Sequence, residues 1–246
     1  MEVHHHPQLE HKPKPWKEYL LEGLMIFLAV FMGFIAETIR EDISERSKGH
    51  EYIRSFVEDL RKDTASFSDL IAFDKHKLAG LSNIYSCYDS VVKDSRSAGC
   101  LVPIIKYSGY NRNENFTDGT MQQLKNAGGF RLLNKSDKDS IISFDNATRA
   151  YLNFESTMFQ QRQNVVRDID VKLLNFKADV ILSSGYDSLK SSREVPLLFS
   201  SDRALLNEFF NDLVLYKRVN ISQMRMVGNL KKQATRLIKY FESKYD

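Results

Sequence analysis

The stretch EYLLEGLMIFLAVFMGFIAETIRED, residues 18–42, decides how this chain begins to fold. Residues 23–36 contain no charged side chain, and a glutamate flanks them on each side. Extension back to Tyr19 gives an apolar stretch in which Glu22 is the only charge. A bilayer core of about 30 Å needs about 20 apolar residues in a helix, with about 17 as the minimum. The stretch therefore predicts a transmembrane helix, which we place at residues 16–38.

Two other interpretations of this stretch fit less well. A buried helix of a soluble protein would carry a polar stripe with a period of 3.6 residues, and residues 23–36 have none. A secretory signal would end in a cleavage region of small residues, whereas this run continues into the charged helical pattern ETIREDISER. Trp16 and Tyr19 precede the run, where amphipathic rings suit a membrane interface.

One face of the predicted span carries small residues together with its acidic residue. At 100° per residue, Glu22, Ala29, Gly33 and Ala36 share a stripe. Ala29 and Gly33 form a small-xxx-small pair, which allows another helix to approach closely, and a carboxylate at membrane depth should face protein or water. The stripe predicts self-association or packing on another membrane protein. The alternative is that Glu22 lies at the level of the lipid headgroups.

The rest of the chain has the pattern of long helices. It has 246 residues, of which 11 are glycine and 5 are proline, which favours helices over a turn-rich β architecture. Residues 1–15 hold three prolines and predict a flexible tail. Residues 39–98 carry apolar side chains at spacings of three, four and seven, and predict a long stalk helix of coiled-coil type. Its charges, including FDKHK at residues 73–77, were expected on the solvent face.

Residues 99–246 predict a helical bundle that the stalk completes. Two further long helices, about 137–179 and 201–245, each carry one apolar stripe, so they should pack as an antiparallel bundle. Gly128 and Gly129 predict a structural turn that ends a short helix, and an anion site with Arg131 is the alternative. Ser136 and Asp139 resemble a capping pattern for the helix that follows. The predicted fold class is all-α.

The charges and the cysteines restrict function only in part. A net charge of +3 calls for neither nucleic acid nor a strongly acidic partner. The basic run within residues 217–246 is either a solvated helix face or a contact with anionic lipid or an acidic partner. Cys87 and Cys100 either form a disulfide in an extracytoplasmic domain or remain two buried thiols in a reducing compartment.

No residue set in the chain indicates catalysis. The sequence has no phosphate-binding loop, dinucleotide-binding glycine pattern, HExxH, CxxC or GxSxG motif. Three adjacent histidines, His4–His6, make a poor metal site on a tail. The carboxylate pairs Glu58–Asp59 and Asp168–Asp170 are expected on solvent faces. We therefore expect no catalytic residue, metal, cofactor or small-molecule substrate.

Three blocks carry a resemblance to a known group of proteins: YLLEGLMIFLAVFMGF (residues 19–34), EYIRSFVEDLRKD (51–63) and MQQLKNAGGFRLLNKSDKDSIISF (121–144). They resemble an uncharacterised, Bacteroidetes-type family of single-pass membrane proteins. The resemblance implies a bacterial inner-membrane location and a helical body on the periplasmic side, but no activity. The tail is less basic than is usual for that group. Basic residues are balanced on the two sides of the span, and the short tail favours a cytoplasmic N-terminus.

These observations predict a non-enzymatic, single-pass membrane protein that contacts membrane lipid. Its helical domain would be an oligomeric interaction or scaffold module, or an accessory subunit of a membrane complex. In the alternative, Glu22 handles an ion or a proton as part of a transport or sensing component.

Overall fold

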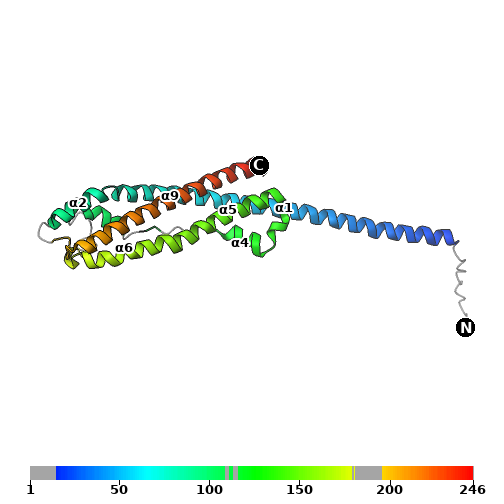
Figure 1. Cartoon of the computed structure of the whole chain (residues 1–246). Coiled ribbons are helices and arrows are strands. Elements are labelled where there is room, and N and C mark those ends of the chain that lie inside the picture. The colour runs from blue at the N-terminus through cyan, green and yellow to red at the C-terminus, as the bar shows by residue number, and fades with distance from the viewer. Residues whose placement is uncertain (1–14, 109–110, 113–115, 179, 181–195, 246) are drawn as a thin grey trace, which may run out of the picture. The chain divides into compact units, whose positions relative to one another are not determined.

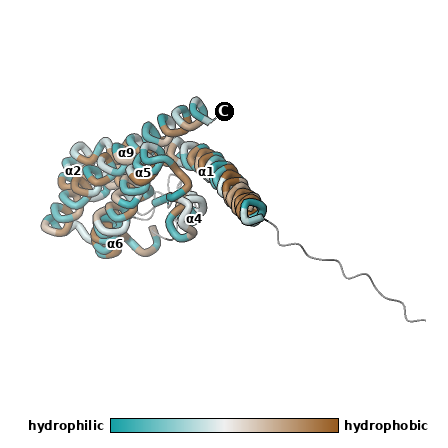
Figure 2. Tube along the Cα trace, turned by 90° about the vertical axis from the view of Figure 1, so that its right-hand side faces the viewer, coloured by the Kyte–Doolittle hydropathy of each residue, from teal (hydrophilic) through white to brown (hydrophobic). Residues whose placement is uncertain are grey.

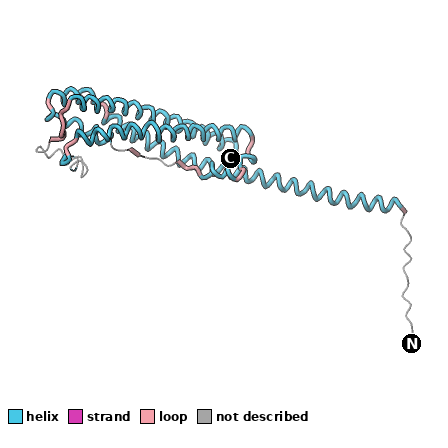
Figure 3. Tube along the Cα trace, turned by 60° about the horizontal axis from the view of Figure 1, so that its bottom comes forward, coloured by secondary structure: helices cyan, strands magenta, loops and turns pink. Residues whose placement is uncertain are grey.

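The computed structural model describes residues 15–108, 111–112, 116–178, 180 and 196–245. The chain divides into two compact units, Met1–Glu51 and Tyr52–Asp246. Among the described residues there is no strand, only an isolated bridge between Leu174 and Leu198, which confirms the all-α class (Figure 3). Residues 1–14 of the predicted flexible tail, with the histidines at positions 4–6, lie outside the described residues.

Helix α1, Trp16–Gly80, begins in the first unit and continues into the second. Its residues 23–36 carry no charged side chain, and this part of the helix is mostly hydrophobic (Figure 2). The prediction of one helix over residues 39–98 was wrong, because α1 ends at Gly80 and a short turn leads into α2, Ile84–Lys93. A Cβ at Gly80 would lie 2.3 Å from Tyr107 Cδ2, so the chain needs a glycine at this helix end.

The second unit places its remaining elements around three long helical segments. After α2 come η1 (Ser95–Cys100), α3 (Leu101–Ser108), α4 (Gly119–Asn126) and η2 (Gly129–Leu132). Then α5 (Lys135–Phe154), the π-helical turn η3 (Glu155–Phe159) and α6 (Gln160–Leu173) follow without a break, and α9 is Arg203–Tyr245. The continuous segment α5–η3–α6 lies alongside α9 (Figure 1).

Two predicted boundaries in this region differ from the structure. The helix expected to end near Asp179 ends at Leu173, because the backbone there bonds to another segment: Phe199 N donates to Leu173 O at 2.8 Å. The helix expected to begin with a Ser136–Asp139 capping pattern is capped by Asn134, whose side chain accepts from Asp137 N. An Asn side chain in this position satisfies a backbone donor of the first turn.

The second unit has two apolar cores. The first is built from α2, η1, α3, α6 and the start of α9 and includes Leu81, Ile84, Leu101, Ile104, Phe159, Ile169, Phe209, Leu213 and Tyr216. The other is built from α1, α4, α5 and the end of α9 and includes Ile53, Phe56, Leu60, Phe67, Ile141, Phe144, Tyr151, Val227 and Phe241. Phe241, near the end of α9, packs edge-on against Phe56 of α1, so α9 runs antiparallel to α1.

Cys87 and Cys100 form a disulfide, with Cα atoms 5.6 Å apart. It joins α2 to the end of η1, and Cys87 is buried in the first core. Of the two alternatives that the sequence left open, the structure therefore has the bonded pair.

Candidate functional site

The first candidate site is the apolar segment of α1. The described chain has one helix long and apolar enough to cross a membrane, and none of its apolar window is buried. Glu22, Ala29, Gly33 and Ala36 lie on this helix and are all exposed. A Cβ built on Gly33 meets no atom within 4 Å, so this face has room for another helix. Trp16 and Tyr19, at the start of the helix, are 69% and 59% exposed.

Gly128 and Gly129 form a structural turn rather than an open loop. Gly128 has φ = 69°, in the left-handed region that favours glycine, directly after α4. At Gly129 a Cβ would lie 3.1 Å from the Leu124 Cα and 3.2 Å from the Tyr52 ring. The two glycines thus reverse the chain where it packs closely on α1.

A second candidate site is a layer of polar side chains inside the helical unit, which the sequence analysis missed. Asp74 and Lys77 of α1 are fully buried, and Glu155 of η3 is 7% exposed. Asn220 and Gln223 of α9 are also fully buried. The expectation that the charges of residues 73–77 face solvent was therefore wrong for the two that lie in the core.

Aromatic rings surround the ammonium group of Lys77. Its Nζ lies 4.5 Å from the centroid of the Phe159 ring and 5.1 Å from that of Tyr216. The Phe73 ring is 5.6 Å away. A cation near the face of an aromatic ring is stabilised by the ring quadrupole, more strongly when water is excluded. The rings therefore offset part of the cost of burying this charge.

The carboxyl group of Asp74 has no comparable support. Neither of its oxygens has a hydrogen-bond partner among the described residues, and the same is true of Lys77 Nζ. Burial raises the pKa of Asp74 to about 7, against the attraction of Lys77 and with added repulsion from Glu155. Burial also lowers the pKa of Lys77 to about 8, although Asp74 and Glu155 oppose that change. Both groups thus titrate much closer to neutrality than in water.

Other polar groups of the layer are partly satisfied within the fold. Tyr216 Oη donates to the carbonyl oxygen of Tyr107 at 3.2 Å. Gln223 Nε2 donates to Tyr151 Oη at 3.3 Å, and Asn220 Nδ2 donates to the Tyr216 carbonyl at 2.8 Å. Burial raises the pKa of Tyr216, so its hydroxyl stays protonated. The layer therefore holds neutral polar groups in place around one cation and two carboxyl groups.

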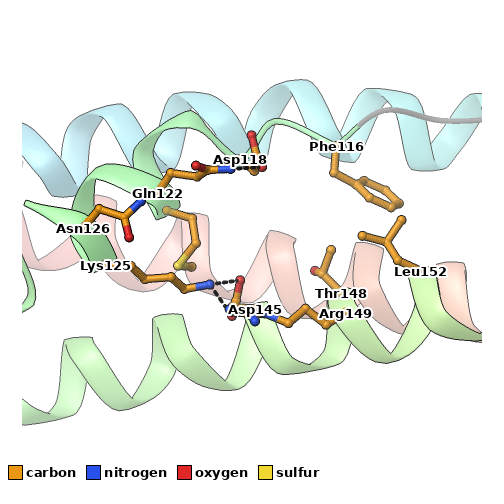
Figure 4. Close-up of a pocket in the computed structure, with 10 residues that line it drawn as sticks. Phe116, Asp118, Gln122, Lys125, Asn126, Asp145, Thr148, Arg149 and Leu152 are labelled. Carbon is orange, nitrogen blue, oxygen red and sulfur yellow. Dashed lines mark hydrogen bonds and ion pairs between the residues drawn. The ribbon is translucent and has the colours of Figure 1, made fainter.

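A surface groove between α4 and α5 is the third candidate (Figure 4). It has a volume of about 650 Å³, and Phe116 and Leu152 lie near one end. Lys125 and Arg149 both bind the carboxylate of Asp145, with closest distances of 2.7 and 2.8 Å. Burial works against ionisation of Asp145, but these two cations outweigh it and lower its pKa. Both of these cations are therefore already paired with a carboxylate.

One carboxylate fastens the end of α9 to the start of α5. Asp137 is fully buried and accepts hydrogen bonds from Lys244 Nζ at 2.7 Å, Tyr240 Oη at 2.8 Å and Tyr245 Oη. Burial opposes its ionisation, but together these donors lower its pKa. The cluster has the form of a structural clamp, since all its members are protein groups that satisfy one another.

The carboxylates of the two pairs considered in the sequence, Glu58–Asp59 and Asp168–Asp170, lie in different surroundings. Asp59 accepts from the Thr120 hydroxyl at 2.5 Å, and Glu58 is exposed. Asp170 was expected on a solvent face but is buried, and Ser108 Oγ donates to it at 3.4 Å. Within the part of the chain that the structure describes, no three His, Cys, Asp or Glu side chains come together as a metal site.

Comparisons with known proteins give no relative for this chain. No family model matches it, and neither the curated proteins nor the solved structures contain a match.

Proposed function

We propose that this chain is a non-enzymatic, single-pass protein of the bacterial inner membrane, and that its helical unit is an interaction or scaffold module outside the cytoplasm. The observation that carries this proposal is the exposed apolar segment of α1. Eleven large apolar side chains within residues 20–34 are each more than two-fifths exposed. Fully burying one such side chain is worth about 1.5–3 kcal/mol, and on average about three-fifths of each is exposed, so moving the eleven out of water is worth roughly 10–20 kcal/mol. A bilayer supplies that environment.

The disulfide supports the proposed side of the membrane. Disulfides persist in oxidising compartments such as the periplasm and are rare in the cytosol. The bond lies in the helical unit, and this supports the proposal of a periplasmic helical unit with the short N-terminal tail in the cytoplasm. The predicted resemblance to Bacteroidetes-type membrane proteins implies the same orientation.

The helical unit is proposed to bind protein rather than to transform a substrate. In the groove between α4 and α5, Lys125 and Arg149 are both paired with Asp145, and the ionisable groups Asp74, Lys77 and Glu155 are buried. The span would pack on a second copy or on another membrane protein through Ala29, Gly33 and Ala36. Such packing suits a membrane scaffold or an accessory subunit.

Extraction of the chain from native membranes in a mild detergent tests the interaction role. The mass of the extracted particle and the proteins that accompany it are then determined. A homo-oligomer or a stoichiometric heterocomplex is the expected result. A monodisperse monomer without a partner at every detergent concentration would contradict the proposal.

The packing face is tested by substitutions within the span. Gly33→Leu should weaken assembly, because the added side chain occupies the space that allows close helix approach. Ile35→Phe adds bulk to the opposite face and serves as the matched control. Equal assembly of the two variants would refute packing through Gly33. Glu22→Gln tests the ion-handling alternative, which would be favoured if ion flux is lost while assembly is kept.

A further inference from the structure

The buried polar layer lies at one level of the helical unit, between its two apolar cores. Along α1 the second core ends at Leu70 and the first begins at Leu81, with Asp74 and Lys77 between them. Along the continuous segment α5–η3–α6, the last buried residue of the second core is Tyr151 and the first core begins at Phe159, with Glu155 between them.

The same alternation of apolar, polar and apolar positions recurs on α9, with the two cores in the reverse order. There the first core ends at Tyr216, the second begins at Val227, and Asn220 and Gln223 lie between. All three long helical segments thus change from apolar to polar at this level and then back to apolar. The layer is the junction through which the two cores are joined.

An ionised Asp74 is poorly supported in this layer. It is fully buried, and neither of its oxygens has a hydrogen-bond partner among the described residues. Lys77 attracts its carboxylate, but Glu155 repels it. A buried carboxylate without hydrogen bonds is costly because little water remains to solvate it. Uptake of a proton by Asp74 removes that buried charge.

The backbone at this level is also irregular. Glu155 begins a π-helical turn, η3, inside an otherwise α-helical segment that runs from α5 to α6. Such turns are rare and often occur at functional sites. The turn brings a carboxyl group and the Phe159 ring to the same layer as Lys77.

We propose that Asp74, Lys77 and Glu155 form a proton-binding site that couples the packing of the two cores to the pH of the surrounding compartment. Loss of the proton from Asp74 leaves a buried carboxylate without a hydrogen bond from the described residues at the junction, and this loosens the junction. The proposal concerns the helical unit alone and does not depend on membrane anchoring.

The groups around Asp74 define the sign of the effect. Lys77 on α1 attracts its carboxylate, Glu155 on η3 repels it, and on α9 Tyr216 contributes a neutral hydroxyl. The backbone carbonyl of Tyr107 on α3 accepts a hydrogen bond from that hydroxyl, and the Tyr151 hydroxyl on α5 accepts one from Gln223.

In the folded chain the pKa of Asp74 is raised to about 7 from its ordinary value of 3.8. Between these two pH values Asp74 is protonated in the folded chain but ionised in the unfolded chain. Stability therefore falls as the pH rises from about 4 to about 7. The pKa of Lys77 is lowered to about 8 from 10.5, so stability rises again between those values. The expected profile has a minimum near pH 7–8.

Thermal unfolding of the full chain in detergent, followed by circular dichroism between pH 5 and 8, tests the proposal. The wild type should melt at a lower temperature at pH 8 than at pH 5. Asp74→Asn should melt higher than the wild type at pH 8 and lose most of this dependence. Asp69→Asn, on the same helix with a side chain that is 67% exposed, is the matched control and should follow the wild type. The same pH dependence in Asp74→Asn and the wild type would overturn the proposal.

Two further variants decide the matter if Asp74→Asn does not fold. Glu155→Gln removes a repelling charge and should move the pH midpoint of the stability change downward by about one unit. Lys77→Met removes the attracting charge and should move it upward. A merely structural role would shift stability without these opposite displacements, so an unmoved midpoint in Glu155→Gln refutes proton binding at this site.

Discussion

Removal of the Cys87–Cys100 disulfide should lower the free energy of unfolding of the helical unit by about 3 kcal/mol. The two cysteines are 13 residues apart in sequence, and closing a loop of about 15 residues in the unfolded chain is worth about 3 kcal/mol. The unit has roughly 195 residues, for which 1 kcal/mol corresponds to about 2–4 °C in melting temperature. The expected fall in melting temperature is therefore about 6–12 °C.

The assay compares denaturant unfolding of the wild type with that of the double variant Cys87→Ala/Cys100→Ala. Reduction of the wild type with a thiol reagent gives the same comparison without changing the side chains in the core. The reagent should have no effect on the double variant, which serves as the control. If reduced and oxidised wild type unfold within about 0.5 kcal/mol of each other, the loop-entropy reasoning fails.

Three other substitutions give distinct expectations for stability. Asp137→Asn should lower the free energy of unfolding by about 1–3 kcal/mol at pH 7, because hydrogen bonds to the carboxylate are lost. Because the pKa of Asp137 is lowered in the folded chain, this difference from the wild type should shrink as the pH falls below 4 in denaturant titrations. Gly128→Ala should cost about 1 kcal/mol because φ is positive there, whereas Gly99→Ala, where a Cβ meets no atom within 4 Å, should cost less in the same titration. Leu60→Ala should cost about 2–5 kcal/mol by leaving a cavity, and Leu152→Ala, at a position 40% exposed, should cost clearly less in thermal melts.

The buried layer could have been found in the sequence from its phase. From α1 into α2, the buried positions follow spacings of three and four through Phe67, Leu70, Asp74, Lys77, Leu81 and Ile84. Asp74 and Lys77 fill the gap between the apolar positions Leu70 and Leu81 in this series. The many charges of residues 73–77 favoured a solvent-exposed helix face, but the spacing of Asp74 and Lys77 matches that of the buried positions. Periodicity outweighs residue type here because a side chain's direction is set by the helix.

The sequence by itself determined the helical class, the apolar segment of α1 and most helix positions. These follow from local properties, since a run of apolar residues or a period of 3.6 acts within one segment. The turn at Gly128 is also a local feature, because the backbone preference of a single glycine for positive φ predicts it.

Only the tertiary structure decided what depends on segments far apart in the chain. Gly80 ends α1 because the Tyr107 ring occupies the place of a side chain, and Leu173 ends α6 where its carbonyl bonds to Phe199. The pairing of Cys87 with Cys100 likewise required two elements to be brought together. The repulsion at Asp74 arises because η3 brings Glu155 to the layer where α1 has already buried Asp74 and Lys77. Such electrostatic coupling depends on distance in space and on burial, which no single segment of sequence contains.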